Sequence, residues 1–264
     1  MACHRKLASL VAACTAWLGI QAAVLHAQEK EPHWTSANLP LNELPADVRE
    51  RVQNVVDHPA LYTRGPAQEF PCDPATYFWL LDHPDRATLA WRRLGARCID
   101  IQDAGDGNFC CNDPNGDEVH WTTVYHTARM RIWYAEGAVK PATLLKPVSG
   151  KAVVVVRHIE GKDEKGRSVI REQTDMILHA DSKTATFVAK VLGASMPQLA
   201  EQYVAHLGNF FSLLAIHLGE HPERAARLLA EKTPQEAQES PLALPTSPGR
   251  IHETMKYAIG TKQP

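Results

Sequence analysis

The chain changes its hydrophobic period, and the last change places a long apolar helix after a set of strands. Residues 118–180 are rich in β-branched and aromatic side chains, and a short charged turn separates residues 151–160 from 168–178. Such residues favour strands, and two strands joined by a short turn predict a β-hairpin. Residues 199–218 are apolar with a helical period. Because such a helix must bury its apolar side against a sheet face, the order predicts an α+β fold.

Shorter segments complete an expected sheet of about six curved antiparallel strands packed on a kinked C-terminal helix. An amphipathic helix is predicted at 46–57, where valines recur at i, i+4, i+7 and i+8. Asp73-Pro74 and Pro84 mark two further helix starts, because proline suits the first helical turn. The other expected elements are strands at 98–102 and 108–111 around a five-residue turn at 103–107, a helix or strand at 182–192, and a short helix at 225–230.

The first 27 residues have the pattern of a secretory signal peptide. Arg5 and Lys6 precede an apolar stretch at 7–25, and Ala27 is a small residue suited to cleavage after it. Two alternatives stay open, a retained membrane anchor and lipid attachment at Cys14. Cleavage would give an exported protein, periplasmic or secreted, with no stable membrane span. The expected organisation is then a linker at 28–45, a single domain at 46–231 and a mostly disordered tail at 232–264.

Charge and cysteine content narrow the class of protein further. Removing residues 1–27 leaves 237 of the 264 residues and takes away two basic and no acidic side chains, so 26 basic residues face 30 acidic ones. The resulting net charge of −4 gives no basic excess for phosphate binding, so nucleic acid is not an expected partner. Four cysteines remain, and an even number in an oxidising compartment predicts two disulfides.

The remaining cysteines are Cys72, Cys98, Cys110 and Cys111. If 103–107 forms a five-residue turn, Cys98 lies opposite Asn112 and shares a sheet face with Cys110, while Cys111 points to the other face. We therefore expect Cys98 to join one member of the neighbouring pair and Cys72 to join the other. The alternative is that one or both pairs remain reduced and buried.

The order of elements at 118–218 resembles the START-like, helix-grip superfamily. The resemblance rests on the strands at 151–160 and 168–180 and on the kinked helical stretch through Gly193, Pro197 and Phe210-Phe211. Members of this superfamily wrap a curved sheet around a C-terminal helix and leave an apolar cavity. The resemblance implies binding of a lipid or another apolar small molecule, and catalysis in some members only.

The long helix carries the side chains expected to line such a cavity. Residues at offsets 0, 3, 7, 10 and 14 share one helix face, and here they are Tyr203, His206, Phe210, Leu213 and His217. Imidazole groups on an apolar face suit hydrogen bonding to the polar end of an apolar ligand, and Met176 and Tyr125 are added from the strands. Two alternatives stay open: the histidines are structural, or a rival stripe faces inward, formed by Leu207, Phe211, Leu214 and Leu218.

Motifs for other chemistry are weak or missing. A zinc site on the sheet would use His120, His126, His158 and His179, but no H-E-x-x-H or Cys-x-x-Cys spacing accompanies them. The Asp- and Gly-rich segment 103–118 fits two hairpin turns better than a calcium loop. The sequence has no phosphate-binding loop, dinucleotide fingerprint or nucleophile motif, so no cofactor is expected.

Three functions remain open from the sequence. The first is an exported protein that binds a lipid or other apolar small molecule between the sheet and the long helix. The second is an enzyme, a hydrolase or cyclase, that uses the same cavity with His206 or His217 as general acid–base. The third is an envelope interaction module without a ligand, whose core would lack a cavity of roughly 300 Å³.

Overall fold

In the computed structural model, residues 39–112, 118–139, 148–180 and 196–233 are described. By its internal contacts the chain divides into two units, 1–35 and 36–264, and the fold below is that of the second. The expected signal peptide, the segment 182–192 and nearly all of the tail lie outside the described residues. The helices are η2 Leu41–Glu43, α2 Ala46–Asp57, α3 Pro74–Asp82, α4 Pro84–Arg93, α6 Met196–Glu220 and α7 Pro222–Leu228. The strands are β1 Leu61–Arg64, β2 Gln68–Pro71, β3 Ile101–Gly105, β4 Asn108–Asn112, β5 Glu118–Thr127, β6 Met130–Val139, β7 Val148–Lys162 and β8 Ser168–His179.

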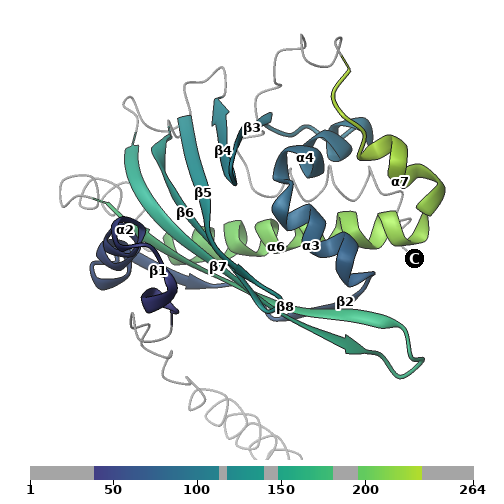
Figure 1. Ribbon diagram of the computed structural model, residues 1–264, viewed down its shortest axis with the longest axis horizontal. Helices are drawn as coiled ribbons and strands as arrows, with labels where there is room; N and C mark the ends of the chain where they lie inside the picture. The colour runs from purple at the N-terminus through teal and green to yellow at the C-terminus, as the bar shows by residue number, and fades with distance from the viewer. Residues whose placement is uncertain (1–38, 113–117, 140–147, 181–195, 234–264) are drawn as a thin grey trace, which may run out of the picture. The chain divides into compact units, whose positions relative to one another are not determined.

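A curved antiparallel sheet of eight strands forms the centre of this unit, and α6 runs along one side of it (Figure 1). The strand order is β1-β8-β7-β6-β5-β4-β3, and β2 also pairs with β8. The hairpin expected from residues 151–160 and 168–178 is confirmed as β7 and β8, with Glu160 opposite Ile170. The expected α+β class, with a curved antiparallel sheet and a long C-terminal helix, is therefore confirmed.

The expected helix starts are also confirmed. Helix α2 spans the twelve residues predicted from its valines. Asp73 caps α3 by accepting a hydrogen bond from the backbone nitrogen of Thr76 at 2.9 Å, and Pro74 stands in the first turn. Helix α4 begins at Pro84, and α7 begins at Pro222, earlier than the predicted start at Ala225.

The sheet has two more strands than expected, β1 and β2. Each is only four residues long. Both pair antiparallel with β8 and together form one interrupted edge of the sheet. Gly65 lies in the interruption and allows α6 to approach, since a Cβ at this position would lie 2.7 Å from Cγ1 of Val204. Segments this short carry too little alternation to be recognised as strands from period alone.

The turn between β3 and β4 consists of Asp106 and Gly107 instead of the five residues expected. Both residues have positive φ, and Asp-Gly is a preferred pair for such a two-residue turn. The tighter turn moves the register, so Gln102 lies opposite Cys110. Cys98 precedes β3 and is not paired across the hairpin, which corrects the expected placement of this cysteine.

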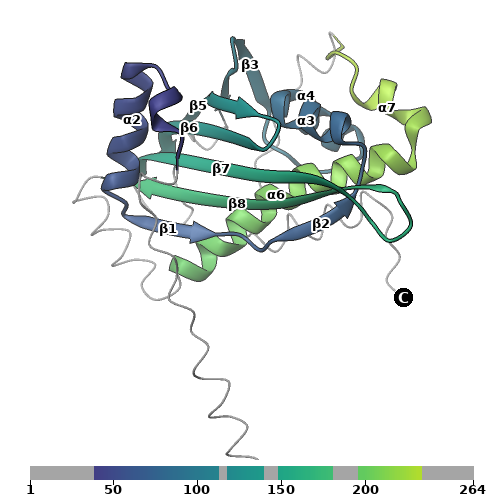
Figure 2. The ribbon, with the colours of Figure 1, turned by 60° about the horizontal axis from the view of Figure 1, so that its bottom comes forward.

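The two faces of the sheet pack against different helices. On β7, Val154 and Val156 belong to the same buried cluster as Phe211 of α6, and the face they share is here termed concave. Val153 and Val155 alternate with them and point to the opposite, convex face. Helix α2 contacts β7 and β8 (Figure 2) and buries its own side chains Val52, Val55 and Val56.

Helix α6 is continuous from Met196 to Glu220. Pro197, one expected site of a kink, stands in the first turn, where proline is tolerated because a backbone N–H at that position would have no acceptor within the helix. Gly193, the other expected site, lies outside the described residues. The helix approaches the sheet closely at Gly208, where a Cβ would lie 2.6 Å from Nε2 of Gln68.

The packed part of the domain begins before Ala46, the boundary expected from the sequence. Leu39 and Leu44 are buried, and η2 lies between them. Arg49 of α2 holds this segment, because its guanidinium donates to the carbonyl oxygens of Leu41 at 2.8 Å and Leu44 at 3.0 Å. This end of the expected linker therefore belongs to the domain. Within the described ranges, the structure has no helix with the length and apolar character needed to cross a membrane.

Candidate functional site

The stripe of α6 expected to line a cavity lies on a flank of the helix. Its members range from Tyr203, which is 54% exposed, to His217, which is 3% exposed. The rival stripe faces the core, since Phe211, Leu214 and Leu218 are all buried. A ligand that contacts the expected stripe would therefore lie beside α6, and not between its innermost side and the sheet. The three half-buried members of that stripe are His206, Phe210 and Leu213.

The two strand residues of the expected site point to different faces. Met176 is half-buried on the concave face, opposite Val154 of β7. Tyr125 lies on the convex face, where its hydroxyl donates to Glu43 at 2.9 Å, so its assignment to the ligand site is wrong. The physical reason is a β-bulge in β5 between Thr123 and Tyr125, which shifts the register by one residue and reverses the facing of Tyr125.

Aromatic side chains cover the concave face beside α6. The Trp133 ring of β6 lies 5.8 Å from the Phe211 ring, and Phe211 lies 5.0 Å from Phe210. On neighbouring strands, Phe109 and Trp121 stack with ring centres 5.6 Å apart. These five residues are here termed the aromatic surface. Several apolar side chains packed against the core here remain partly exposed, and thus available to a ligand: Trp121, Met176, Leu207, Phe210 and Leu213.

The indole nitrogen of Trp133 is buried in this surface and has no hydrogen-bond acceptor among the described residues. Trp133 is 5% exposed. By contrast, the indole nitrogen of Trp91 donates to the carbonyl oxygen of Phe210 at 2.9 Å. An indole N–H can only donate, and burying it unpaired costs about 1–3 kcal/mol. Because buried donors are nearly always paired, this group points to an acceptor from outside the described chain.

A buried carboxylate, Glu172, lies farther along the concave face. It accepts hydrogen bonds from the hydroxyls of Tyr77 at 2.8 Å and Thr174 at 2.7 Å, and from the amide of Gln68 at 3.3 Å. Burial raises the pKa of Glu172, and these three hydrogen bonds oppose the rise. Since α3, β2 and β8 supply the donors, the carboxylate joins these elements to one another.

His158 of β7 is a second buried polar side chain on this face. Its ring lies 4.7 Å from the Phe78 ring and 6.1 Å from the Tyr77 ring. Burial first, and the positive charge of Arg131 second, lower the pKa of His158 to about 4. Arg131 is held by two hydrogen bonds to Asp82, at 2.8 and 3.1 Å. The imidazole is therefore neutral near pH 7 and enclosed as part of the core.

The four histidines considered for a zinc site do not converge. His158 is enclosed beneath α3, whereas His120 and His126 are exposed on opposite faces of β5. The ring of His179 is engaged elsewhere, since its Nδ1 lies 2.7 Å from the backbone oxygen of His58. Over the described ranges, no group of three or more His, Cys, Asp or Glu side chains is arranged to hold a metal ion.

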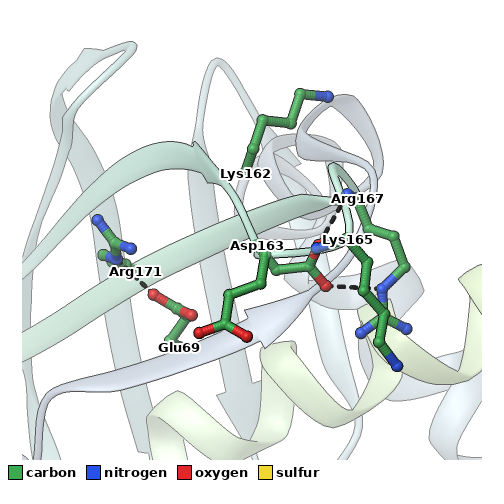
Figure 3. A pocket seen from close by; sticks show the side chains of 7 residues that line it. Glu69, Lys162, Asp163, Lys165, Arg167 and Arg171 are labelled. Carbon is green, nitrogen blue, oxygen red and sulfur yellow. Dashed lines mark hydrogen bonds and ion pairs between the residues drawn. The ribbon is translucent and has the colours of Figure 1, made fainter.

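A pocket of about 420 Å³ lies beside the turn of the β7–β8 hairpin (Figure 3). Both of its arginines are paired, Arg167 with Asp163 and Arg171 with Glu69. Lys162 donates to the hydroxyl of Ser168 at 2.9 Å. Every residue that lines the pocket is charged, so it is not the apolar cavity expected from the sequence. Its lining is formed by Glu69, Lys162, Asp163, Glu164, Lys165, Arg167 and Arg171.

No disulfide joins any two of the four cysteines in the described part of the chain, so the expected disulfides are not formed in this structure. Cys72 and Cys98 lie in the core cluster, and burial raises the pKa of each thiol to about 12. Cys110 and Cys111 are neighbours on β4 and therefore point to opposite faces. Cys111 is buried on the concave face, whereas Cys110 is half-buried on the convex face.

The sheet and α6 define an α+β protein of helix-grip arrangement. Solved structures to which the chain is similar include a conserved protein from Geobacillus kaustophilus, with 8% identity and a TM-score of 0.39 over 60% of this chain and 97% of the other. A norcoclaurine synthase point mutant from Thalictrum flavum, in complex with a transition-state analogue, shows 16% identity and a TM-score of 0.36 over 61% and 96%. The protein Ara h 8.0201 shows 14% identity and a TM-score of 0.31 over 55% and 97%.

No family model matches the sequence. No curated protein matches it either.

Proposed function

We propose that the protein binds an apolar small molecule, a lipid or an aromatic compound, against the aromatic surface between the sheet and α6. The observation that carries this proposal is the indole nitrogen of Trp133, a buried donor without an acceptor in the described chain. The side chains around it are apolar, and several of them keep exposed surface. The ligand expected from this combination is mainly hydrocarbon and carries one oxygen that accepts the indole proton.

The energetic argument has two parts. Covering partly exposed apolar surface contributes about 25 cal/mol for each Å² removed from water, which favours a ligand without charge. Pairing the Trp133 N–H removes a penalty of about 1–3 kcal/mol that the unliganded protein bears. The first part gives affinity for apolar molecules in general, and the second selects among them for those with an acceptor.

A matched ligand pair tests the second part. We expect 2-acetylnaphthalene, which carries a carbonyl oxygen, to gain affinity relative to 2-ethylnaphthalene when the Trp133 N–H is present. In Trp133→Phe, the preference for 2-acetylnaphthalene over 2-ethylnaphthalene, measured as the ratio of their dissociation constants, should fall by about fivefold to tenfold. This change is equivalent to losing a hydrogen bond of about 1 kcal/mol. Isothermal titration calorimetry on wild type and variant provides all four constants.

The control variant is Trp79→Phe, because Trp79 is half-buried on α3 and stacks on His83 at 4.2 Å, away from the aromatic surface. This variant should leave the affinity ratio as in the wild type. The proposal is overturned if neither naphthalene binds or raises the melting temperature, or if Trp133→Phe leaves the ratio unchanged. The hypothesis of an enzyme that uses His206 or His217 stays a prediction, and His217 is only 3% exposed.

The proposed site of action follows from the N-terminal sequence. The signal pattern at 1–27 supports binding of the ligand after export, with the mature chain beginning at Gln28. Mass spectrometry of the full-length protein, produced in a secreting host, tests this. A chain that retains residues 1–27, or that carries lipid at Cys14, would overturn the proposed processing without affecting the ligand test.

A further inference from the structure

The convex face of β4 and β5 brings together a cysteine, a histidine and a glutamate that are separated in the sequence. Cys110 of β4 lies directly opposite His120 of β5. Opposite residues of an antiparallel pair have Cβ atoms about 4.5–5.5 Å apart, on the same face of the sheet. Glu118 is two residues before His120 and shares that face. The three side chains therefore form one surface cluster, here termed the thiol cluster.

Hydrogen bonds orient the members of the thiol cluster. Nε2 of His120 lies 3.0 Å from Oε1 of Glu118. Because the carboxylate can only accept, Nε2 carries the proton, and in the neutral imidazole Nδ1 is left as the acceptor. The Cys110 thiol lies 3.9 Å from Oε1 of Gln102 on the other neighbouring strand. The thiol therefore has to rotate from Gln102 toward His120 before the imidazole can take its proton. A base with a fixed tautomer within such reach of a thiol can activate cysteine as a nucleophile.

Solvent access separates Cys110 from the other thiols. Cys72, Cys98 and Cys111 are buried, whereas Cys110 is half-buried and faces away from the core. The side chain of His120 is 55% exposed and that of Glu118 is 66% exposed. A small reagent can therefore reach the thiol cluster without unfolding the sheet, and reaching the other three cysteines requires the core to open.

We propose that Cys110 is a site of thiol–disulfide exchange with low-molecular-weight disulfides, with His120 as its base and Glu118 as the positioning residue. The Cys110 thiol gives its proton to Nδ1 of His120, and the thiolate attacks one sulfur of the disulfide R–S–S–R. The bond between the two reagent sulfurs breaks while a bond forms from Cys110 to the attacked sulfur. The departing thiolate takes the proton from His120 and leaves as R–SH, so atoms and charge balance.

Charged side chains of both signs surround the cluster. Glu118 lies beside His120 on the same strand, and Glu136 of β6 lies directly opposite His120. Lys151 of β7 lies opposite Glu136, and Arg51 of α2 lies over the tyrosine ring whose hydroxyl donates to Glu136. These two cations balance the two glutamates, so the cluster does not select the charge of the disulfide. Cystamine, a small disulfide with two ammonium groups, is the probe.

The test uses the purified chain, cystamine, and mass spectrometry of the intact protein and of its peptides. Among the four cysteines that the structure describes, we expect the cysteamine adduct on Cys110 alone. His120→Ala should slow its formation at least about tenfold, less than the 10²–10⁴ that an enclosed general base supplies, because this cluster is open to water. Free imidazole in the buffer should restore part of the rate in His120→Ala, and a merely structural role of His120 would not give that rescue.

The matched control is His126→Ala, which removes an exposed histidine from the same strand on the other face and should leave the rate unchanged. Glu118→Gln should slow the reaction less than His120→Ala, because the imidazole remains. The proposal is overturned if the adduct forms on Cys72, Cys98 or Cys111, if Cys110 is already bonded to another cysteine of the chain, or if His120→Ala reacts at the wild-type rate.

Discussion

The hydroxyl of Tyr77 offers a direct measurement of what the Glu172 network contributes to stability. Tyr77 has no exposed surface, and its hydroxyl donates to Oε2 of Glu172 at 2.8 Å. Tyr77→Phe removes this hydroxyl and keeps the ring, which packs 5.3 Å from the Phe70 ring. A hydrogen bond to a charged group contributes about 1.5–3 kcal/mol. We therefore expect the free energy of unfolding at pH 8 to fall by about 2 kcal/mol, which lowers Tm by about 4–8 °C for a domain of this size.

The pH dependence of this loss follows from the pKa of Glu172. Burial raises the pKa of Glu172 in the folded state above its pKa in the unfolded state. The free energy of unfolding therefore falls as the pH rises from the unfolded-state pKa through the folded-state pKa. The hydrogen bond from Tyr77 opposes the rise, so the pKa of Glu172 is higher still in Tyr77→Phe. The variant therefore loses more stability than the wild type over that interval. At pH 4 the carboxyl is protonated, and the difference should shrink to the 0.5–1.5 kcal/mol, roughly, of a neutral hydrogen bond.

Urea denaturation followed by circular dichroism at pH 4 and pH 8 measures both differences. Tyr125→Phe is the matched control, because Tyr125 also donates to a glutamate, Glu43 at 2.9 Å, but in an exposed position. Its free energy of unfolding should stay within error of the wild type at both pH values. The reasoning is refuted if the two variants lose equal stability, or if the loss in Tyr77→Phe is the same at pH 4 as at pH 8.

Two further predictions concern the same face of the sheet. Gly208→Ala should lower the free energy of unfolding by about 1–2 kcal/mol, because its Cβ would lie 2.6 Å from Nε2 of Gln68 and 3.2 Å from Oε1 of Glu172. The control is Gly219→Ala, whose Cβ would meet nothing within 4 Å. It should be neutral or slightly stabilising in the same denaturation assay. Because the pKa of His158 is lowered to about 4, stability should decline as pH falls from 6.5 toward 4, by on the order of 2–3 kcal/mol. His158→Phe should flatten that part of the measured pH profile, and an unchanged slope would contradict the assignment.

Local pattern was enough to predict the α+β class and most helices, because those depend on short-range signals. Ala46–Asp57 has a complete apolar stripe, and Asp73 is followed at once by Pro74. β7 and β8 are long, rich in β-branched residues and joined by a short charged turn, so the hairpin was clear from local sequence. The interrupted edge formed by β1 and β2 escaped prediction because its strands exist through pairing with β8, which lies about a hundred residues away in the sequence.

The site was less predictable, because the direction in which each side chain points depends on tertiary contacts. Tyr125 would share a face with Thr123 in a regular strand, and the bulge between them reverses that. The long helix has two apolar stripes, and only its packing on the sheet shows that the one with Phe211 is innermost. Trp133 carried no signal at all, because tryptophan is ordinary in a strand. Glu172 did carry a signal in the sequence. It lies two residues after Ile170 on the same strand, so its carboxylate points to the same inward face as that apolar side chain.

The alternation of side chains across the sheet makes the two proposed activities physically separable. Trp133 points to the concave face, whereas Cys110 and His120 point to the convex face, with the hydrogen-bonded sheet between them. A ligand on the aromatic surface therefore does not contact the thiol cluster, and a cysteamine adduct on Cys110 does not contact the ligand. Naphthalene affinity should be equal in modified and unmodified protein, and equal cystamine rates should be found with and without naphthalene. Coupling between the two would require the sheet itself to move, which its eight paired strands and the close contact of Gly208 with the Glu172 network oppose.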